Sequence, residues 1–261
     1  ALLGYEQYYS FEYNHNATKM GLIDPSIWAG DTATQLISSG GSASDYASRS
    51  FFGRLNYVYA DKYLFEANLR YDGSSRFASE SRWGLFPSFS AGWRIEQEKW
   101  MKNAGFDLLK LRASWGRLGN NSIGNYDYQA TYKAHNYSFN NVLVNGLAVS
   151  SFANNALRWE ATTSTDVGLD IGVLNNRLTA EVDLYNKVTD GILYRPTIYL
   201  TAGTATAPYE NIAEVTNRGV ELTLGWRDSV EDFHYSFSGN FAFNHNRVSK
   251  YKGELKEYWE E

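Results

Sequence analysis

Residues 62–72 read KYLFEANLRYD, and apolar and polar side chains alternate along them from Phe65 to Asp72. One parity is apolar and comprises Tyr63, Phe65, Ala67, Leu69 and Tyr71. The other parity is polar and comprises Glu66, Asn68, Arg70 and Asp72. Because successive side chains of a β-strand point to opposite faces, this segment predicts a strand with one apolar and one polar side.

The same period of two recurs along the chain. Clear copies occupy residues 108–117, 164–173, 220–227 and 233–244, and weaker copies occupy 5–13, 51–59, 85–95 and 178–184. Together with 62–72, these segments make about nine predicted strands within a single domain, residues 1–261. The chain is therefore predicted to be all-β.

The predicted connections alternate between short and long. Short links occupy residues 60–62, 175–176 and 228–231, and a somewhat longer one, 96–106, has room for one helical turn. Long connections occupy residues 15–48, 73–83, 118–158 and 189–218, the third of which contains two extended segments, 126–132 and 137–144. Outer-membrane barrels have short turns at one rim and long loops at the other. This alternation predicts antiparallel transmembrane β-barrel strands with long extracellular loops.

Aromatic residues are abundant for a chain of mean hydropathy −0.45. Several lie on the apolar parity near the short-turn ends: Tyr57, Tyr59, Tyr63, Phe65, Trp93, Trp226, Phe233 and Tyr235. Aromatic side chains gather at membrane–water interfaces. We therefore predict an aromatic girdle along the short-turn rim.

The alternative is a secreted, soluble β-sandwich that binds carbohydrate, because sandwich strands also alternate. Connections of roughly 30 to 40 residues are unusual in a compact domain. The apolar rows also continue for about the ~9–11 residues that a strand needs to cross a bilayer. Both features favour the barrel, and solubility without detergent separates the two hypotheses.

Composition excludes several classes of activity. The absence of cysteine excludes thiol chemistry, and a net charge of −5 with dispersed Lys and Arg argues against nucleic acid as a partner. The four histidines, His15, His135, His234 and His245, lack metal-ligand spacing. We expect no metal site, no cofactor and no enzymatic activity.

Two pairs of carboxylates face the polar side of the predicted strands. They are Asp166 with Asp170, and Glu181 with Asp183. Such pairs serve glycosidases as acid and base. On a barrel wall we instead expect them to form ion pairs with nearby cations, namely Arg54, Arg70, Lys110, Arg112 or Arg227.

Ordered segments of the chain resemble the SusC/RagA family of TonB-dependent outer-membrane transporters of Bacteroidetes. The resemblance is carried by KYLFEANLRYDGSSRF (62–77), WGLFPSFSAGWR (83–94), LKLRASWG (109–116), RWE (158–160), GLD (168–170) and NRGVEL (217–222). It implies a 22-stranded, plugged barrel that imports glycans or peptides. It also implies a SusD-like surface lipoprotein as a lid, and TonB–ExbB–ExbD acting through the plug.

Measured against that family, the sequence corresponds to an internal part of the barrel. We expect the plug, the signal peptide and the final strands to lie outside residues 1–261. If the resemblance holds, aromatic residues of the long loops are expected to contact an oligosaccharide or oligopeptide substrate. The candidates are Trp28, Tyr46, Tyr126, Tyr128, Tyr137 and Tyr209.

Overall fold

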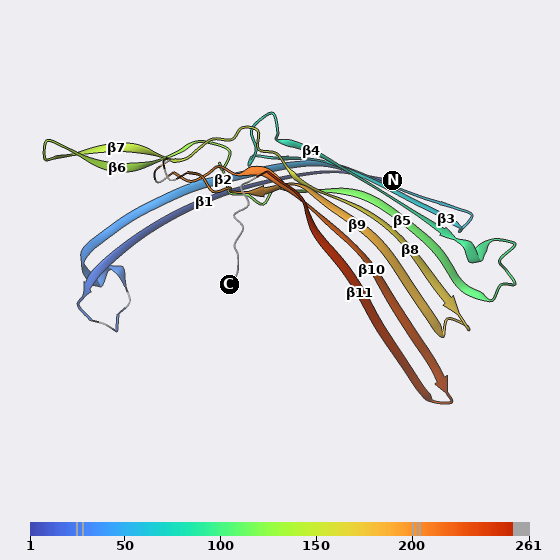
Figure 1. The fold of residues 1–261 in the computed structure, drawn as a ribbon. Helices are drawn as coiled ribbons and strands as arrows, with labels where there is room; N and C mark the ends of the chain where they lie inside the picture. Colours follow the sequence, from blue (N-terminus) through green and yellow to red (C-terminus); the bar gives the residue numbers. More distant parts are fainter. Residues whose placement is uncertain (25, 28, 200, 202, 204, 253–261) are drawn as a thin grey trace, which may run out of the picture.

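The computed structural model describes residues 1–252 except 25, 28, 200, 202 and 204. Nine antiparallel strands form one sheet in the order β1-β2-β3-β4-β5-β8-β9-β10-β11, and β6 and β7 form a separate hairpin (Figure 1). The strand bounds are β1 Leu2–Leu22, β2 Ala33–Tyr59, β3 Tyr63–Ser74, β4 Trp83–Arg94, β5 Phe106–Asn120, β6 Thr131–Phe139, β7 Val142–Ser151, β8 Glu160–Val173, β9 Leu178–Tyr194, β10 Glu210–Val230 and β11 Phe233–Tyr251. The predicted all-β class is confirmed.

Short turns join the strands at one rim. Ala60 and Asp61 in the β2–β3 turn, and Asn175 and Asn176 in the β8–β9 turn, have positive φ angles of 53° to 59°. Tight turns between antiparallel strands often need this left-handed backbone, and Asn and Asp tolerate it well. Between β4 and β5 a single 3₁₀ turn, η2 (Ile95–Gln97), occupies the place where one helical turn was predicted.

The strand register gives the sheet two chemically different faces. One row crosses five strands through Leu111, Leu169, Val182, Leu222 and Phe241. The row beside it crosses the same strands through Lys110, Asp170, Glu181, Thr223 and Asn240. Side chains of these two rows point to opposite sides of the sheet.

The apolar face is exposed, as Phe241 illustrates at 61%. Among the described residues, a buried hydrophobic cluster instead lies in the loops, around Phe77, Ile123 and Leu157. A β-sandwich packs the apolar faces of two sheets against each other. Since the described chain forms one curved layer (Figure 1), the sandwich alternative is wrong.

Two of the predicted long connections are shorter than expected, because the strands continue beyond the alternating segments. β1 and β2 pair from Leu2↔Arg54 to Leu22↔Ala33, so their connection covers residues 23–32 instead of 15–48. Similarly, β9 and β10 leave residues 195–209 as their connection instead of 189–218. A short 3₁₀ turn, η1 (Gly30–Thr32), precedes β2.

The hairpin expected within 118–158 is present as β6 and β7. Its strands begin later than the predicted segments 126–132 and 137–144, and the turn between them lies at Asn140 and Asn141, which have positive φ angles. In Figure 1 the hairpin projects away from the sheet at the loop end. No helix of the described residues is long and apolar enough to cross a membrane.

Aromatic side chains form rows at both ends of the apolar face. At the short-turn rim, the Tyr63 ring stacks with Tyr59 at 6.3 Å and with Trp93 at 6.4 Å, which confirms the predicted clustering. A second, unpredicted group lies toward the loops, where the Trp83 ring stacks on Tyr71 at 4.8 Å and on Phe51 at 6.3 Å. Aromatic rings therefore border the apolar face at both ends, the short-turn rim and the loop end.

Candidate functional site

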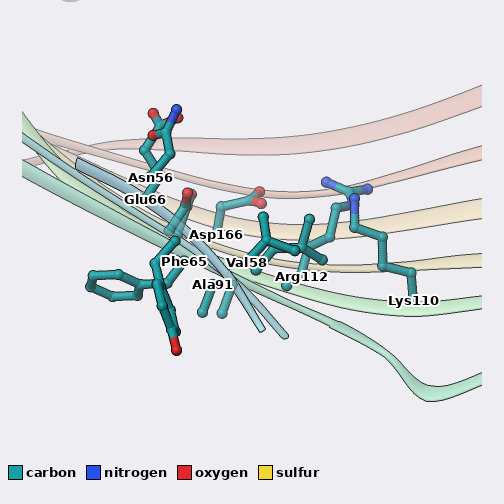
Figure 2. A pocket seen from close by; sticks show the side chains of 14 residues that line it. Asn56, Val58, Phe65, Glu66, Ala91, Lys110, Arg112 and Asp166 are labelled. Carbon is teal, nitrogen blue, oxygen red and sulfur yellow. The ribbon is translucent and has the colours of Figure 1, made fainter. Parts of the chain in front are cut away.

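The polar face of the sheet carries a shallow hollow. Its lining includes Asn56, Glu66, Lys110, Arg112 and Asp166, from β2, β3, β5 and β8. Figure 2 shows Phe65 pointing to the opposite side of the sheet from Asn56 and Glu66. Strand alternation therefore presents amide and charged groups on one side of the sheet and rings on the other.

Arg112 is the centre of an ion-pair network on this wall. Its guanidinium lies 2.7 Å from Asp170 Oδ1 and 3.0 Å from Asp183 Oδ1. Its Nε also donates to Asp170 at 2.8 Å. The planar guanidinium suits carboxylates bonded through several N–H groups at once. The predicted pairing of the acidic row with Arg112 is confirmed for Asp170 and Asp183.

Gly168 leaves room for the Arg112 guanidinium. A Cβ atom added to Gly168 would lie 2.8 Å from Arg112 Cζ and 2.3 Å from Asp183 Oδ1. Gly168 pairs with both Arg112 and Asp183 in the register of the sheet. The missing side chain lets Arg112 cross β8 to reach β9.

Two further cations on the wall have acidic partners other than the predicted carboxylate pairs, so the prediction was wrong for Arg54 and Arg70. Arg70 lies 3.1 Å from Asp72 and 3.8 Å from Glu6, and Arg54 lies 3.9 Å from Glu66. These side chains are partly exposed, so each pair contributes little to stability by itself. Their effect is to line the wall with alternating charge.

Above the sheet, the loops share a small hydrophobic core. Phe77 and Leu157 are fully buried and Ile123 is nearly so, with Tyr128 and Tyr209 packed against them. These residues come from the β3–β4, β5–β6, β7–β8 and β9–β10 connections. The loops are therefore held together by packing across the strand ends. We call the loop residues gathered around this core the loop cluster.

Trp159 joins the loop cluster to the sheet. Its ring lies 5.2 Å from Phe77 and 5.3 Å, edge to face, from Phe86 of β4. Its Nε1 donates to the carbonyl of Arg82 at 3.0 Å. A partly buried Trp that also satisfies its N–H helps to fix the position of the chain around it.

Tyr46, which was predicted in a long connection, belongs to β2 and meets the loop cluster beneath an arginine. Arg76 Cζ is 4.5 Å from the centre of the Tyr46 ring, and Asn121 Nδ2 donates to the Tyr46 hydroxyl at 3.2 Å. Arg76 also donates to Asn125 Oδ1 and to the Asn121 carbonyl, both at 3.1 Å. Arg76 thus fixes the start of the β5–β6 connection against β2.

Tyr126 and Tyr128 belong to that same connection. The Tyr126 hydroxyl donates to the Asp45 carboxylate and accepts the Asp45 backbone N–H at 2.9 Å. The Tyr128 carbonyl accepts the backbone N–H of Asn154 at 2.9 Å. The tyrosines therefore link residues that are far apart in the sequence.

Tyr209 lies on the other side of the loop cluster, beneath Arg195. Arg195 Cζ is 4.4 Å from the centre of the Tyr209 ring, and Arg195 also forms an ion pair with Asp127 at 2.9 Å. Asn154 Nδ2 donates to the Tyr209 carbonyl at 2.7 Å. Two arginine–ring contacts consequently flank the loop cluster.

Four of the six sequence-predicted residues meet here: Tyr46, Tyr126, Tyr128 and Tyr209. Tyr137 lies apart, 62% exposed on β6, with its ring 4.9 Å from Phe139. Trp28 lies outside the described residues. Sequence reasoning missed Arg76 and Arg195. Arg76 lies in residues 72–77, DGSSRF, which belong to a segment that carries the family resemblance, and this could have marked it as a candidate. No local sequence pattern marks Arg195.

A cluster of hydrogen bonds around Glu98 lies at the short-turn rim, at the opposite end of the sheet from the loops. Glu98 accepts hydrogen bonds from the Tyr63 hydroxyl at 2.8 Å, from Lys62 Nζ at 3.0 Å and from Trp93 Nε1 at 3.2 Å. The bond from Tyr63 and then the one from Lys62 lower the pKa of Glu98 most. This carboxylate ties the β4–β5 link to the aromatic girdle.

The chain is similar to transport receptors over most of its length. It is 37% identical over 219 residues to the TonB-dependent receptor SusC of Bacteroides thetaiotaomicron, covering 80% of this chain and 22% of that protein. It is 39% identical over 215 residues to the TonB-dependent receptor P39 of Formosa agariphila, covering 82% of this chain and 20% of that protein. The chain thus spans about a fifth of the length of these curated relatives.

Solved structures show the same arrangement of strands. A structure of the RagAB peptide importer in a closed-closed state matches with a TM-score of 0.87 and 29% identity, covering 98% of this chain and 28% of that one. The siderophore receptor PirA from Pseudomonas aeruginosa, at 14% identity and a TM-score of 0.54 over 96% of this chain and 41% of that one, shares the fold alone.

The family model described as TonB dependent receptor-like, beta-barrel matches residues 1–258. The match agrees with the antiparallel sheet, its apolar and polar faces and the long loops at one rim. The chain belongs to the TonB-dependent receptor β-barrel family.

Proposed function

We propose that residues 1–261 form part of the barrel wall of an outer-membrane transporter that imports an oligosaccharide or oligopeptide. The observation that carries this proposal is the uninterrupted pair of rows across the sheet, apolar from Leu111 to Phe241 and polar from Lys110 to Asn240. Such a sheet is stable where one side meets lipid and the other meets a water-filled lumen. Proteins of this family are outer-membrane proteins, which supports the same location for this chain.

The sheet needs further strands to function in lipid. Among the described residues, β1 and β11 are the two edges of the large sheet. Inside a bilayer, unpaired backbone groups cost several kcal/mol each, so a barrel must close. In the transporter that we propose, strands outside residues 1–261 pair with both edges, and a plug segment fills the lumen.

The proposed mechanism moves a solute without making or breaking a bond. A SusD-like lipoprotein covers the loop end, and TonB–ExbB–ExbD acts on the plug. The RagAB peptide importer, which resembles this chain, supports a peptide as the substrate class, and the resemblance to the SusC/RagA family keeps a glycan as the other candidate. The polar wall suits either class, because its amide and paired ionic groups offer donors and acceptors to a hydrated solute. The import that we propose requires no enzymatic step and no cofactor.

Within this proposal, the loop cluster and the separate β6–β7 hairpin are the places of substrate contact. Tyr126 and Tyr137 are the more exposed candidates, at 37% and 62%, whereas Tyr128 and Tyr209 pack on the hydrophobic core. Exposed rings stack on sugar rings and on flat peptide groups. Trp28 remains a candidate from the sequence, and the half-buried Tyr46 ring contacts Arg76 and Tyr8.

The test uses the full-length transporter in its own cells. Deleting the gene is expected to abolish uptake of one glycan or peptide, and the wild-type protein is expected in the outer membrane with heat-modifiable gel mobility. Recovery as a soluble monomer without detergent would contradict the proposal.

Alanine replacement tests substrate contact separately. Replacing Tyr126 and Tyr137 together is expected to weaken substrate affinity by about 2- to 10-fold per ring, as stacking contacts of ~0.5–1.5 kcal/mol imply. Tyr59→Ala, at the opposite rim, is the matched control and leaves affinity unchanged. Equal affinity in the wild type and the double variant would remove these residues from the site.

A further inference from the structure

Two arginines, Arg49 and Arg82, lie where the apolar face meets the loops. A charged side chain has no evident role at this position. The register places Arg49, Gly73 and Trp83 in one row across β2, β3 and β4. The next row on the same side of the sheet contains Phe51, Tyr71 and Leu85 of the apolar face. Arg49 therefore points to the lipid side of the proposed barrel, one step beyond the rings.

Arg49 and Arg82 line the same hollow. The other lining residues are Ala47, Ser48, Gly73, Ser74, Ser75 and Trp83, so none of the described residues around it carries a carboxylate. Within the described part of the chain, neither arginine forms an ion pair, unlike Arg70 or Arg112 on the polar wall. Two guanidiniums facing one hollow repel each other unless an anion joins them.

Arg82 carries the more specific signal. Its Nε is buried and has no hydrogen-bond partner among the described residues. Leaving a buried donor unpaired costs roughly 1–3 kcal/mol, and more for a charged group. The Arg82 carbonyl accepts the Ser74 N–H at 3.1 Å and Trp159 Nε1 at 3.0 Å, so the backbone beneath the guanidinium is held in place.

Ser75 adds a third donor. Its Oγ accepts the Ala47 N–H at 3.0 Å, which leaves the hydroxyl hydrogen available to donate, because a hydroxyl group both donates and accepts. The hollow therefore offers two guanidiniums and one hydroxyl. Such a set of donors binds a phosphate group.

The surroundings favour a lipid over a free anion. Phe51, Tyr71 and Trp83 are 49%, 43% and 37% exposed directly beside the hollow. An acyl chain covers such rings while its headgroup reaches the arginines, whereas a free phosphate leaves the rings bare. We propose that Arg49, Arg82 and Ser75 bind the phosphate group of a lipid in the outer leaflet. This proposal rests on the membrane orientation given under Proposed function.

The experiment titrates the full-length transporter in detergent with lipid A and follows bound lipid by native mass spectrometry. The variant R49Q/R82Q is expected to bind lipid A about 10- to 30-fold more weakly, as ~1 kcal/mol per basic residue implies. R49K/R82K is expected to retain part of the affinity, since it keeps the charge but loses the fork of N–H donors.

Arg177→Gln is the matched control. Arg177 is an exposed arginine at the opposite rim and already pairs with Asp228 at 3.0 Å. Its replacement is expected to leave lipid A binding unchanged. Equal binding by wild type and R49Q/R82Q would overturn the proposal. So would inorganic phosphate displacing lipid A at equal concentration, because the site would then hold a free anion.

Uptake of the nutrient distinguishes this inference from the proposed function. The side chains of Arg49 and Arg82 line the hollow on the lipid side, and R49Q/R82Q keeps the Arg82 carbonyl that accepts Trp159 Nε1, so this variant is expected to transport normally. Loss of lipid binding with normal uptake supports the lipid site. Absence of uptake in the wild type, by contrast, would contradict the proposed function, and the lipid titration would still report on the arginines.

Discussion

Gly168 shows how one missing side chain shapes the polar wall. The Arg112 guanidinium lies over it and reaches Asp170 and Asp183 on two neighbouring strands. These side chains are partly buried, and separating a partly buried ion pair leaves charges without their partners. The glycine and the arginine therefore act as one unit.

Gly168→Ala is expected to displace Arg112 and to destabilise the full-length barrel by about 1–3 kcal/mol, the usual cost of overfilling a packed site. Gly239→Ala is the control, because a Cβ atom at Gly239 meets nothing within 4 Å. The temperature at which heat-modifiable mobility is lost measures the difference. Equal temperatures for the two variants would contradict the role given to Gly168.

Glu98 makes the short-turn rim sensitive to acid. Hydrogen bonds from Tyr63, Lys62 and Trp93 lower its pKa in the folded state. A lowered folded-state pKa contributes stability above the unfolded-state pKa of about 4.5, and that stability is lost as pH falls through the folded-state value.

Wild type is therefore expected to lose more stability than Glu98→Gln when the pH falls from about 6 to about 3, the range in which carboxylates titrate. Unfolding of the two full-length proteins at several pH values measures this difference. Parallel losses in both proteins would show that Glu98 does not contribute.

Among the larger elements, the loop cluster is expected to fold as a unit that is distinct from the membrane strands. Phe77→Ala or Leu157→Ala removes a fully buried side chain, which typically costs about 2–5 kcal/mol. Faster hydrogen exchange is expected in the β3–β4, β5–β6 and β9–β10 connections, with little change near the short turns. Leu147→Ala is the control, because Leu147 is 76% exposed on β7.

The strands could be predicted from sequence only where their two faces meet different surroundings. Alternation is clear in 62–72, but it fades in residues 38–44, which read SSGGSAS and still belong to β2. Both faces of the outer β1–β2 hairpin are exposed, so no period of two is imposed there. The predicted connection between β1 and β2 was too long for this reason.

The candidate site could be predicted only in part. Strand parity placed Asp170 and Asp183 on the same face as Arg112, because alternation is a local property. The contact of Asp45 with Tyr126 joins residues 81 positions apart, and local patterns do not report which loops meet. The sequence therefore suggested aromatic loop residues but not the arginines that hold them.

At the scale of the whole molecule, the sheet has one apolar and one polar face, and within the described residues β1 and β11 are its two edges. Expressed alone, residues 1–261 are expected to aggregate or to remain in detergent-bound oligomers, because no further strand among the described residues pairs with the β1 or β11 edge and the apolar face is exposed. Size-exclusion chromatography in detergent checks this expectation. A monodisperse monomer without detergent would contradict it.

The central claim is that the apolar face of the sheet meets lipid and the polar face meets a water-filled lumen. The absence of cysteine in this chain allows this claim to be tested residue by residue. Thr223 and Leu224 are adjacent on β10, and their side chains lie on the polar and the apolar face. Each is replaced by cysteine in a full-length transporter that is otherwise free of cysteine, reconstituted in lipid and treated with a water-soluble maleimide. The barrel account predicts that the cysteine at 223 reacts and that the cysteine at 224 is protected but is reached by a lipid-soluble reagent. Equal reaction of both with the water-soluble reagent, or faster reaction at 224, would contradict it.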